Sequence, residues 1–160
     1  MNLYLPLHTR KVYVNTIILP LLEYGCIVWT GQGNATLMLS LQVVMNNAAK
    51  IFLDRPINSS SSDALNILGW STLESRRTAQ RCIYMFKSIN NLIDNNIAYY
   101  CGSDVHHYNT RRKNSLRSFI SRTSEGLLRN KLIDDWNRLP AGIQSITNLT
   151  VFKRSLKDVI

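Results

Sequence analysis

Two adjacent aspartates, Asp134 and Asp135, are candidates for binding a catalytic metal ion. Asp134 and Asp135 follow two apolar residues, and clustered carboxylates can hold Mg²⁺ on the attacking and leaving oxygens of a phosphoryl transfer. Here the pair lies in a helical pattern between Leu132 and Trp136, shortly before Pro140, with no strand signals around it. No third carboxylate follows an upstream strand. We therefore interpret the pair as a solvated acidic face and predict no catalytic residue.

The histidines and cysteines predict neither a metal site nor a nucleophile. His106 and His107 are adjacent, and adjacent side chains point apart in an extended chain. The sequence has three cysteines, Cys26, Cys82 and Cys101. An odd number without Cys-x-x-Cys spacing is typical of reduced thiols in an intracellular protein. The sequence has no glycine-rich phosphate loop after a strand. We predict no metal, no cofactor and no small-molecule substrate.

The charge of the chain indicates a different kind of partner. With 160 residues, 45% hydrophobic and 18% charged, the sequence is typical of a folded chain of ordinary domain size. Its net charge is +9, and residues 106–160 hold eleven basic and four acidic residues, net +7. Such a concentration predicts a polyanion, because neutralised phosphates release counterions. A soluble basic surface is the alternative. The predicted contacts are Arg111, Arg112, Lys113, Arg117, Lys153, Arg154 and Lys157.

Apolar spacing predicts a mostly α fold of about five to six helices in an irregular bundle, with an irregular basic segment around 100–123. Strand signals are weak. Residues 12–29 approach the length of a membrane span, but Pro20 and Glu23 interrupt them, so we predict buried helix rather than a span. Pro20 should break or kink the first helix. The predicted helices cover residues 8–29, 35–52, 63–68, 72–93, 125–139 and 149–159.

Each longer helix has a predicted buried stripe. In residues 35–52 the stripe is Leu37, Leu41, Val44, Ala48 and Ile51, at steps of four and three. On or beside the other face lie Gln42, Asn46, Asn47 and Lys50, which we interpret as solvated; contact with a sugar–phosphate backbone is the alternative. In residues 72–93 the stripe is Ala79, Cys82, Phe86, Ile89 and Ile93, and the residues off the stripe include Arg76, Arg77, Arg81 and Lys87. A capping box, Ser71 to Glu74, precedes this helix. In residues 125–139 the stripe is Leu128, Leu132, Trp136 and Leu139. In residues 149–159 it is Leu149, Phe152, Leu156 and Val159.

Six short motifs follow one another along nearly the whole chain. They are Ile18–Gly25 with Trp29, Leu41–Val43 with Asn47–Ile51, Leu68–Arg77, His107–Arg111, Trp136–Pro140 and Phe152–Lys157. Each motif alone is weak, but in this order they resemble the C-terminal region, thumb and post-thumb, of non-LTR (LINE-like) retrotransposon reverse transcriptases. This chain departs from the family where it has leucines and isoleucine in place of a Phe-rich stretch before the fifth motif.

The resemblance implies a parent RNA-directed DNA polymerase that copies RNA into DNA at a nicked target. It implies a thumb-like helical region over residues 1–100 and a basic C-terminal helical region over 101–160, or one continuous domain. The palm with its metal-binding aspartates is absent from this sequence, so the chain is expected to be no enzyme. The implied partners are an RNA/DNA duplex or hybrid and the missing polymerase domain, in the cytoplasm or nucleus. The alternatives are a protein-interaction or structural module, and a transposon-derived relic without independent activity.

Overall fold

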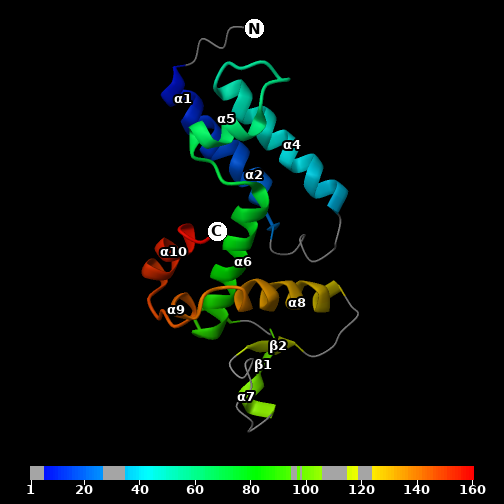
Figure 1. Cartoon of the computed structure of the whole chain (residues 1–160), viewed down its shortest axis with the longest axis vertical. Helices are drawn as coiled ribbons and strands as arrows, with labels where there is room; N and C mark the ends of the chain where they lie inside the picture. Colours follow the sequence, from blue (N-terminus) through cyan, green and yellow to red (C-terminus); the bar gives the residue numbers. More distant parts are fainter. Residues whose placement is uncertain (1–5, 27–34, 95–96, 98, 106–114, 119–123) are drawn as a thin grey trace. The chain divides into compact units, whose positions relative to one another are not determined.

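The computed structural model describes residues 6–26, 35–94, 97, 99–105, 115–118 and 124–160 (Figure 1). These residues are mostly helical, as predicted. The contacts divide the chain into two compact units, unit 1 (Met1–Cys26 and Asn34–Arg76) and unit 2 (Ile27–Gly33 and Arg77–Ile160). The sequence prediction of two regions, 1–100 and 101–160, or of one continuous domain, stays a prediction. Within the described ranges, no helix has the length and apolar character needed to cross a bilayer.

The elements follow one another in two groups. Unit 1 contains α1 (Leu7–Tyr13), the π-helical turn η1 (Val14–Ile18), α2 (Leu19–Glu23), α4 (Ala35–Phe52) and α5 (Ser61–Leu68). The unit boundary lies within α6 (Leu73–Ile89). Unit 2 continues with β1 (Tyr99–Cys101), α7 (Gly102–Val105), β2 (Leu116–Ser118), α8 (Ser124–Asn137), α9 (Ala141–Gln144) and α10 (Leu149–Lys157).

The first helical run continues across Pro20, where the sequence predicts a break or kink. In η1 the Leu19 N–H donates to the Val14 carbonyl, five residues back. This wider turn accommodates proline, which has no N–H to donate and whose ring crowds the carbonyl four residues before it. The run ends before Gly25, which has a left-handed φ of 62°. The predicted end of this helix, at Trp29, lies outside the described residues.

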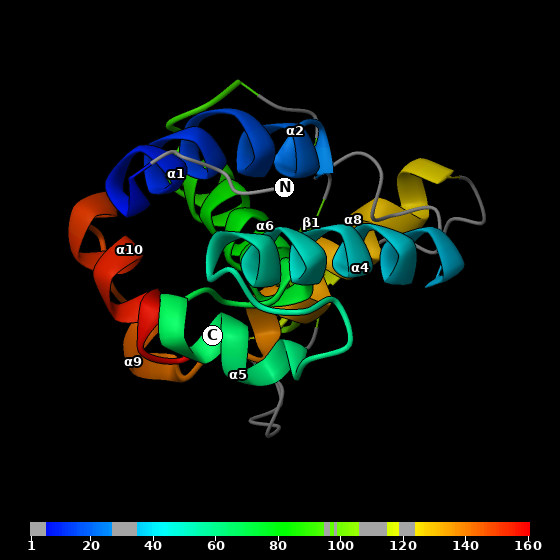
Figure 2. The ribbon, with the colours of Figure 1, turned by 90° about the horizontal axis from the view of Figure 1, so that it is seen from above.

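The buried face of α4 is shifted by one residue from the predicted stripe. The bounds of α4 are those predicted, and Figure 2 shows α4 between the α1–α2 run and α5. The core side chains of α4 are Met45, Ala49 and Phe52, whereas Val44 and Ile51 of the predicted stripe are exposed. Both rows follow steps of three and four residues. Only the neighbouring helices decide which row is covered.

Two polar residues of α4 that were predicted to be solvated form hydrogen bonds within unit 1. Lys50 is buried, and its Nζ donates to the Ile57 carbonyl at 2.6 Å. Gln42 donates to Asn46 Oδ1 and accepts from the Leu73 N–H, both at 2.8 Å. The solvated interpretation is wrong for these two side chains, because a loop and the start of α6 satisfy their polar groups.

Both ends of α6 differ from the prediction. Thr72, not Ser71, is the capping residue, and its Oγ1 accepts from the Ser75 N–H at 3.2 Å. The helix ends at Ile89, four residues earlier than predicted, because Asn91 adopts a left-handed φ of 53°. The Leu92 N–H then donates to the Lys87 carbonyl at 2.8 Å. This bond is typical of a Schellman motif, in which the left-handed residue after the helix is usually glycine and sometimes asparagine.

The core of unit 2 is built around Phe152 of α10. Its ring stacks on Phe86 of α6, with centroids 4.4 Å apart, and lies 5.8 Å from the ring of Trp136 of α8. Leu132 and Leu156 are buried in the same cluster. The central residues of both predicted C-terminal stripes are therefore confirmed as core. Trp136 is a core anchor, as predicted, and Trp29 lies outside the described residues.

A small antiparallel sheet lies in the segment that was predicted to be irregular. The paired residues of β1 and β2 are Tyr99 with Ser118, Tyr100 with Arg117, and Cys101 with Leu116. Asn137, at the end of α8, donates to the Leu116 carbonyl at 2.8 Å and accepts from the Leu116 N–H at 3.0 Å. Its side-chain amide thus acts as a further strand neighbour and satisfies the outer edge of β2.

Candidate nucleic-acid interface

The cations predicted on the last helix share one exposed side of α10. Lys153, Arg154 and Lys157 are all exposed, while Phe152 and Leu156 hold the opposite side against the core of unit 2. Steps of three and four residues bring side chains together on a helix surface, so Lys153 and Arg154 both neighbour Lys157. Positive charge in the last turn also matches the negative end of the helix dipole.

Arg117 lies on a different element from these three cations. It is half-buried in β2, and β2 contacts α8 through the clamp that Asn137 forms on Leu116. Within unit 2, Figure 1 shows α10 beside α6, and the β1–β2 sheet on the other side of α8. The structure therefore brings the α10 cations together and holds Arg117 apart from them. The other predicted contacts, Arg111, Arg112 and Lys113, lie outside the described residues.

Arg81 and Asp135 form an ion pair inside unit 2, which overturns one sequence interpretation. Arg81 Nε donates to Asp135 Oδ2 at 2.5 Å, and the two side chains are 0% and 1% exposed. Arg81 donates a second bond to Thr78 Oγ1 at 2.8 Å. The solvated acidic face is thus correct for Asp134, which is exposed, and wrong for Asp135.

Two of the α6 arginines lie off the predicted stripe, as expected, but they are buried all the same. Besides the predicted row with Cys82 and Phe86, α6 has a second covered row beside it. A helix packed by neighbours on two sides buries a wider arc than one stripe. The residues of this second row are Arg77, Arg81, Met85 and Ser88.

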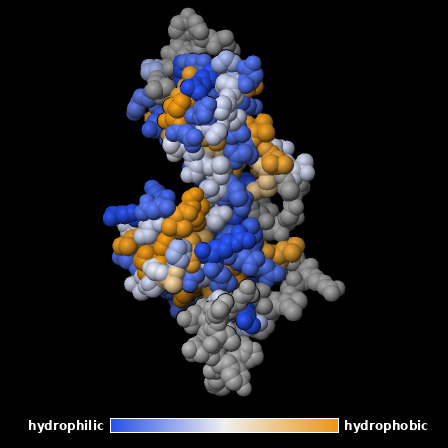
Figure 3. All heavy atoms as spheres, viewed as in Figure 1, coloured by the Kyte–Doolittle hydropathy of each residue, from blue (hydrophilic) through white to orange (hydrophobic). Residues whose placement is uncertain are grey.

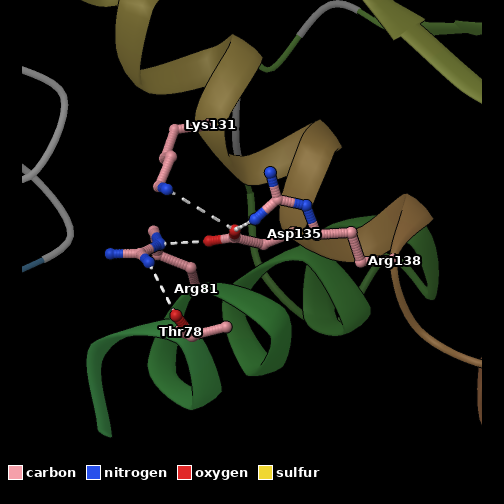
Figure 4. A network of polar contacts seen from close by, with 5 residues as sticks. All are labelled: Thr78, Arg81, Lys131, Asp135 and Arg138. Atoms are coloured by element: carbon pink, nitrogen blue, oxygen red, sulfur yellow. Dashed lines mark hydrogen bonds and ion pairs between the residues drawn. The ribbon is translucent and has the colours of Figure 1, made fainter. Parts of the chain in front are cut away.

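Two more cations face the same carboxylate. Lys131 Nζ and Arg138 Nη1 each lie 3.8 Å from Asp135 Oδ1, as Figure 4 shows. The Arg138 side chain is 74% exposed, so its charge reaches the solvent. Sequence reasoning missed both residues, although their spacing of four and three from Asp135 on one helix was a usable signal. What it could not show is that Arg81 already neutralises Asp135.

The two units differ in net charge, in line with the concentration of basic residues in the last part of the sequence. Unit 1 holds five Lys and Arg against four Asp and Glu, net +1. Unit 2 holds fourteen against six, net +8. Nearly the whole surplus therefore belongs to the unit that carries α8 and α10. Such a field attracts polyanions and is screened by salt.

Cys82 lies beside this ion pair and is a core thiol, as predicted. It is fully buried. Burial, and then the negative charge of Asp135, raises the pKa of Cys82 from 9.0 to about 12, and the charge of Arg81 acts in the opposite direction. The thiolate is the reactive form, so this cysteine stays protonated and inert near neutral pH.

The raised pKa of Cys82 predicts that the protein loses stability in alkali. The unfolded thiol releases its proton above pH 9.0, whereas the folded thiol keeps it up to about 12. The contribution to stability is therefore complete below pH 9.0 and falls as pH rises toward 12, by up to about 1.4 kcal/mol per pH unit. Urea unfolding at a series of alkaline pH values measures this change. The free energy of unfolding should fall less steeply with pH in Cys82→Ala than in the wild type. Equal declines in the variant and the wild type would contradict this assignment.

Among the described residues, no group of three or more His, Cys, Asp or Glu side chains is placed to hold a metal ion. His106 and His107 lie outside them. Comparisons with protein-family models, with curated proteins and with solved structures found no match for this chain.

Proposed function

We propose that this chain is a non-catalytic, nucleic-acid-binding segment from the C-terminal region of a non-LTR retrotransposon reverse transcriptase. Its unit 2 would contact the sugar–phosphate backbone of an RNA–DNA hybrid or duplex without reading the bases. The observation that carries the proposal is the net charge of +8 in unit 2, with three adjacent exposed cations on α10.

The residues of the Trp136–Pro140 motif hold the fold of unit 2 together and are not themselves the proposed contact surface. Trp136 packs in the core, Asn137 holds β2, and α8 ends before Pro140. Gln144 adds Nε2 bonds to the carbonyls of Trp136 and Leu139, at 2.8 and 3.1 Å. These bonds fix the end of α8 that carries Arg138. The motif thus anchors the segment that carries one exposed cation, Arg138.

Removing the α10 cations tests the proposal directly. We predict that the triple variant Lys153→Gln, Arg154→Gln and Lys157→Gln binds a short RNA–DNA hybrid more weakly. Every cation that no longer neutralises a phosphate lowers the slope of log K against log salt by about one, so the slope should fall by about two to three. Fluorescence anisotropy titrations of a labelled hybrid at several salt concentrations measure this slope.

A variant with the same reduction of charge elsewhere serves as the control. Lys11, Arg55 and Lys87 are on other elements, and changing all three to Gln removes the same formal charge. The control should keep most of the wild-type slope. If both triple variants lower the slope equally, net charge rather than the α10 surface drives binding. If the wild-type chain does not bind the hybrid at low salt, the proposal is wrong.

A protein-interaction role is the second candidate function, and it concerns unit 1. Figure 3 shows hydrophobic residues at the surface of this unit. Exposed large apolar side chains occur on both its N-terminal run and α4, including Ile17, Leu21, Val44 and Ile51. Apolar patches of several hundred Å² on a soluble protein mark interaction sites. We propose that unit 1 binds a protein while unit 2 binds nucleic acid.

A further inference from the structure

The N-terminal helical run has two parallel apolar rows, and the described chain covers one of them. The covered row faces the core of unit 1 and consists of Val14, Ile18 and Leu22. The exposed row, named here the N-terminal stripe, consists of Tyr13, Ile17 and Leu21, which are 52, 45 and 72% exposed. A π turn holds more than 3.6 residues, so steps of four residues across η1 keep each row on one face.

A groove runs alongside this stripe, between the N-terminal run and α4. Its volume is about 500 Å³, and its apolar lining includes Tyr13, Ile18, Val44, Ala48 and Ile51. Tyr13 belongs to both features, so the stripe and the groove form one continuous surface. The surface thus offers both a row of large side chains and a recess that apolar side chains can fill.

We propose that this surface is the interface between two copies of the chain, with their N-terminal runs antiparallel about a two-fold axis. The stripe is symmetric about Ile17, with Tyr13 four residues before it and Leu21 four residues after it. An antiparallel copy therefore sets Tyr13 opposite Leu21, and Ile17 opposite Ile17. The groove beside each stripe receives side chains from the other copy, as a self-complementary interface requires.

Charge and area both favour a second copy as the occupant. Arg10 lines the groove, but its charge is paired with Asp54 at 2.6 Å. The sequence has no charged residue between Lys11 and Glu23, and unit 1 has a net charge of only +1, so two like surfaces meet with little repulsion. With about 150–250 Å² for an exposed aromatic and somewhat less for an aliphatic side chain, the stripe with Val44 and Ile51 presents on the order of 500 Å². That exceeds the ~400 Å² per partner of most crystal contacts and approaches the ~800 Å² of stable interfaces.

Sedimentation equilibrium of the full chain, treated with nuclease, tests this inference. The wild type should reach twice the monomer mass of 18.3 kDa at micromolar concentration. Leu21→Asp places a charge twice in the symmetric interface, each time opposite Tyr13 of the other copy, and should raise the dimer Kd by at least about thirtyfold, as for a hot-spot residue. Ile67→Asp, on an exposed position of α5, is the matched control and should leave the Kd unchanged. Circular dichroism verifies that both variants are folded.

Two further measurements separate this interface from other modes of association. Apolar association should persist from about 0.1 to about 1 M NaCl, whereas bridging by residual nucleic acid should disappear. Ile17→Cys should form a disulfide-linked dimer on mild oxidation, and Ile67→Cys should not. A dimer that is insensitive to Leu21→Asp, or that dissociates in high salt, would overturn the proposed interface.

The inference rests on the interaction role proposed for unit 1, and the two can fail separately. The dye ANS reports exposed apolar surface on the monomer. If the chain stays monomeric but Leu21→Asp lowers its ANS fluorescence, self-association is wrong and the surface serves another protein, such as a polymerase domain. If the chain is monomeric and ANS fluorescence is unchanged, both the interface and the interaction role are wrong.

Discussion

Replacing Asp135 with alanine is expected to lower the free energy of unfolding by about 3–5 kcal/mol, because it leaves the buried Arg81 charge without its carboxylate. A decrease of that size is a large part of the ~5–15 kcal/mol that stabilises a typical native protein. The neighbours Lys131 and Arg138 add to the effect, because both cations face the same oxygen at 3.8 Å. Urea unfolding followed by circular dichroism measures the change.

The adjacent aspartate is a natural control. Asp134 is exposed, so Asp134→Ala should change the free energy of unfolding by no more than about 0.5 kcal/mol. The double variant Arg81→Met with Asp135→Leu removes both charges and should restore most of the stability. An Asp135→Ala variant as stable as Asp134→Ala would show that the ion pair is not buried in solution.

Replacing Phe152 with alanine is expected to cost about 3–5 kcal/mol and to weaken nucleic-acid binding as well. The ring is fully buried between Phe86 and Trp136, so its removal leaves a cavity at the centre of unit 2. The nine residues of α10 are too few for a stable isolated helix, and Phe152 and Leu156 supply its buried contacts. Loosening α10 should displace the cations on its other side.

Two measurements on the same variant link stability to function. Amide hydrogen exchange should be faster in α10 than in the wild type, and the salt slope for the RNA–DNA hybrid should fall as in the α10 triple variant. Val151→Ala, at an exposed position of the same helix, should change neither. A Phe152→Ala variant with faster exchange and an unchanged slope would show that the α10 cations do not bind phosphate.

The candidate site was partly predictable because some of its signals are local. An amphipathic helix that presents Phe152 and Leu156 on one side must present Lys153 and Lys157 on another. By contrast, Asp134 and Asp135 have the same local signal, and one is exposed while the other is buried. That difference depends on Arg81, which is 54 positions away along the chain. No local pattern contains such a pairing.

The sequence by itself determined the helical class of the protein, the bounds of α4, the central core residues of α8 and α10, and the overall positive charge. Helical spacing, prolines and charge act over a few residues, so these features need no tertiary context. Only the packing of the folded chain selects which of two adjacent rows on α4 is covered, and only that packing buries two arginines of α6. Each of these depends on contacts between distant segments, because several helix faces satisfy the same spacing and only packing selects among them.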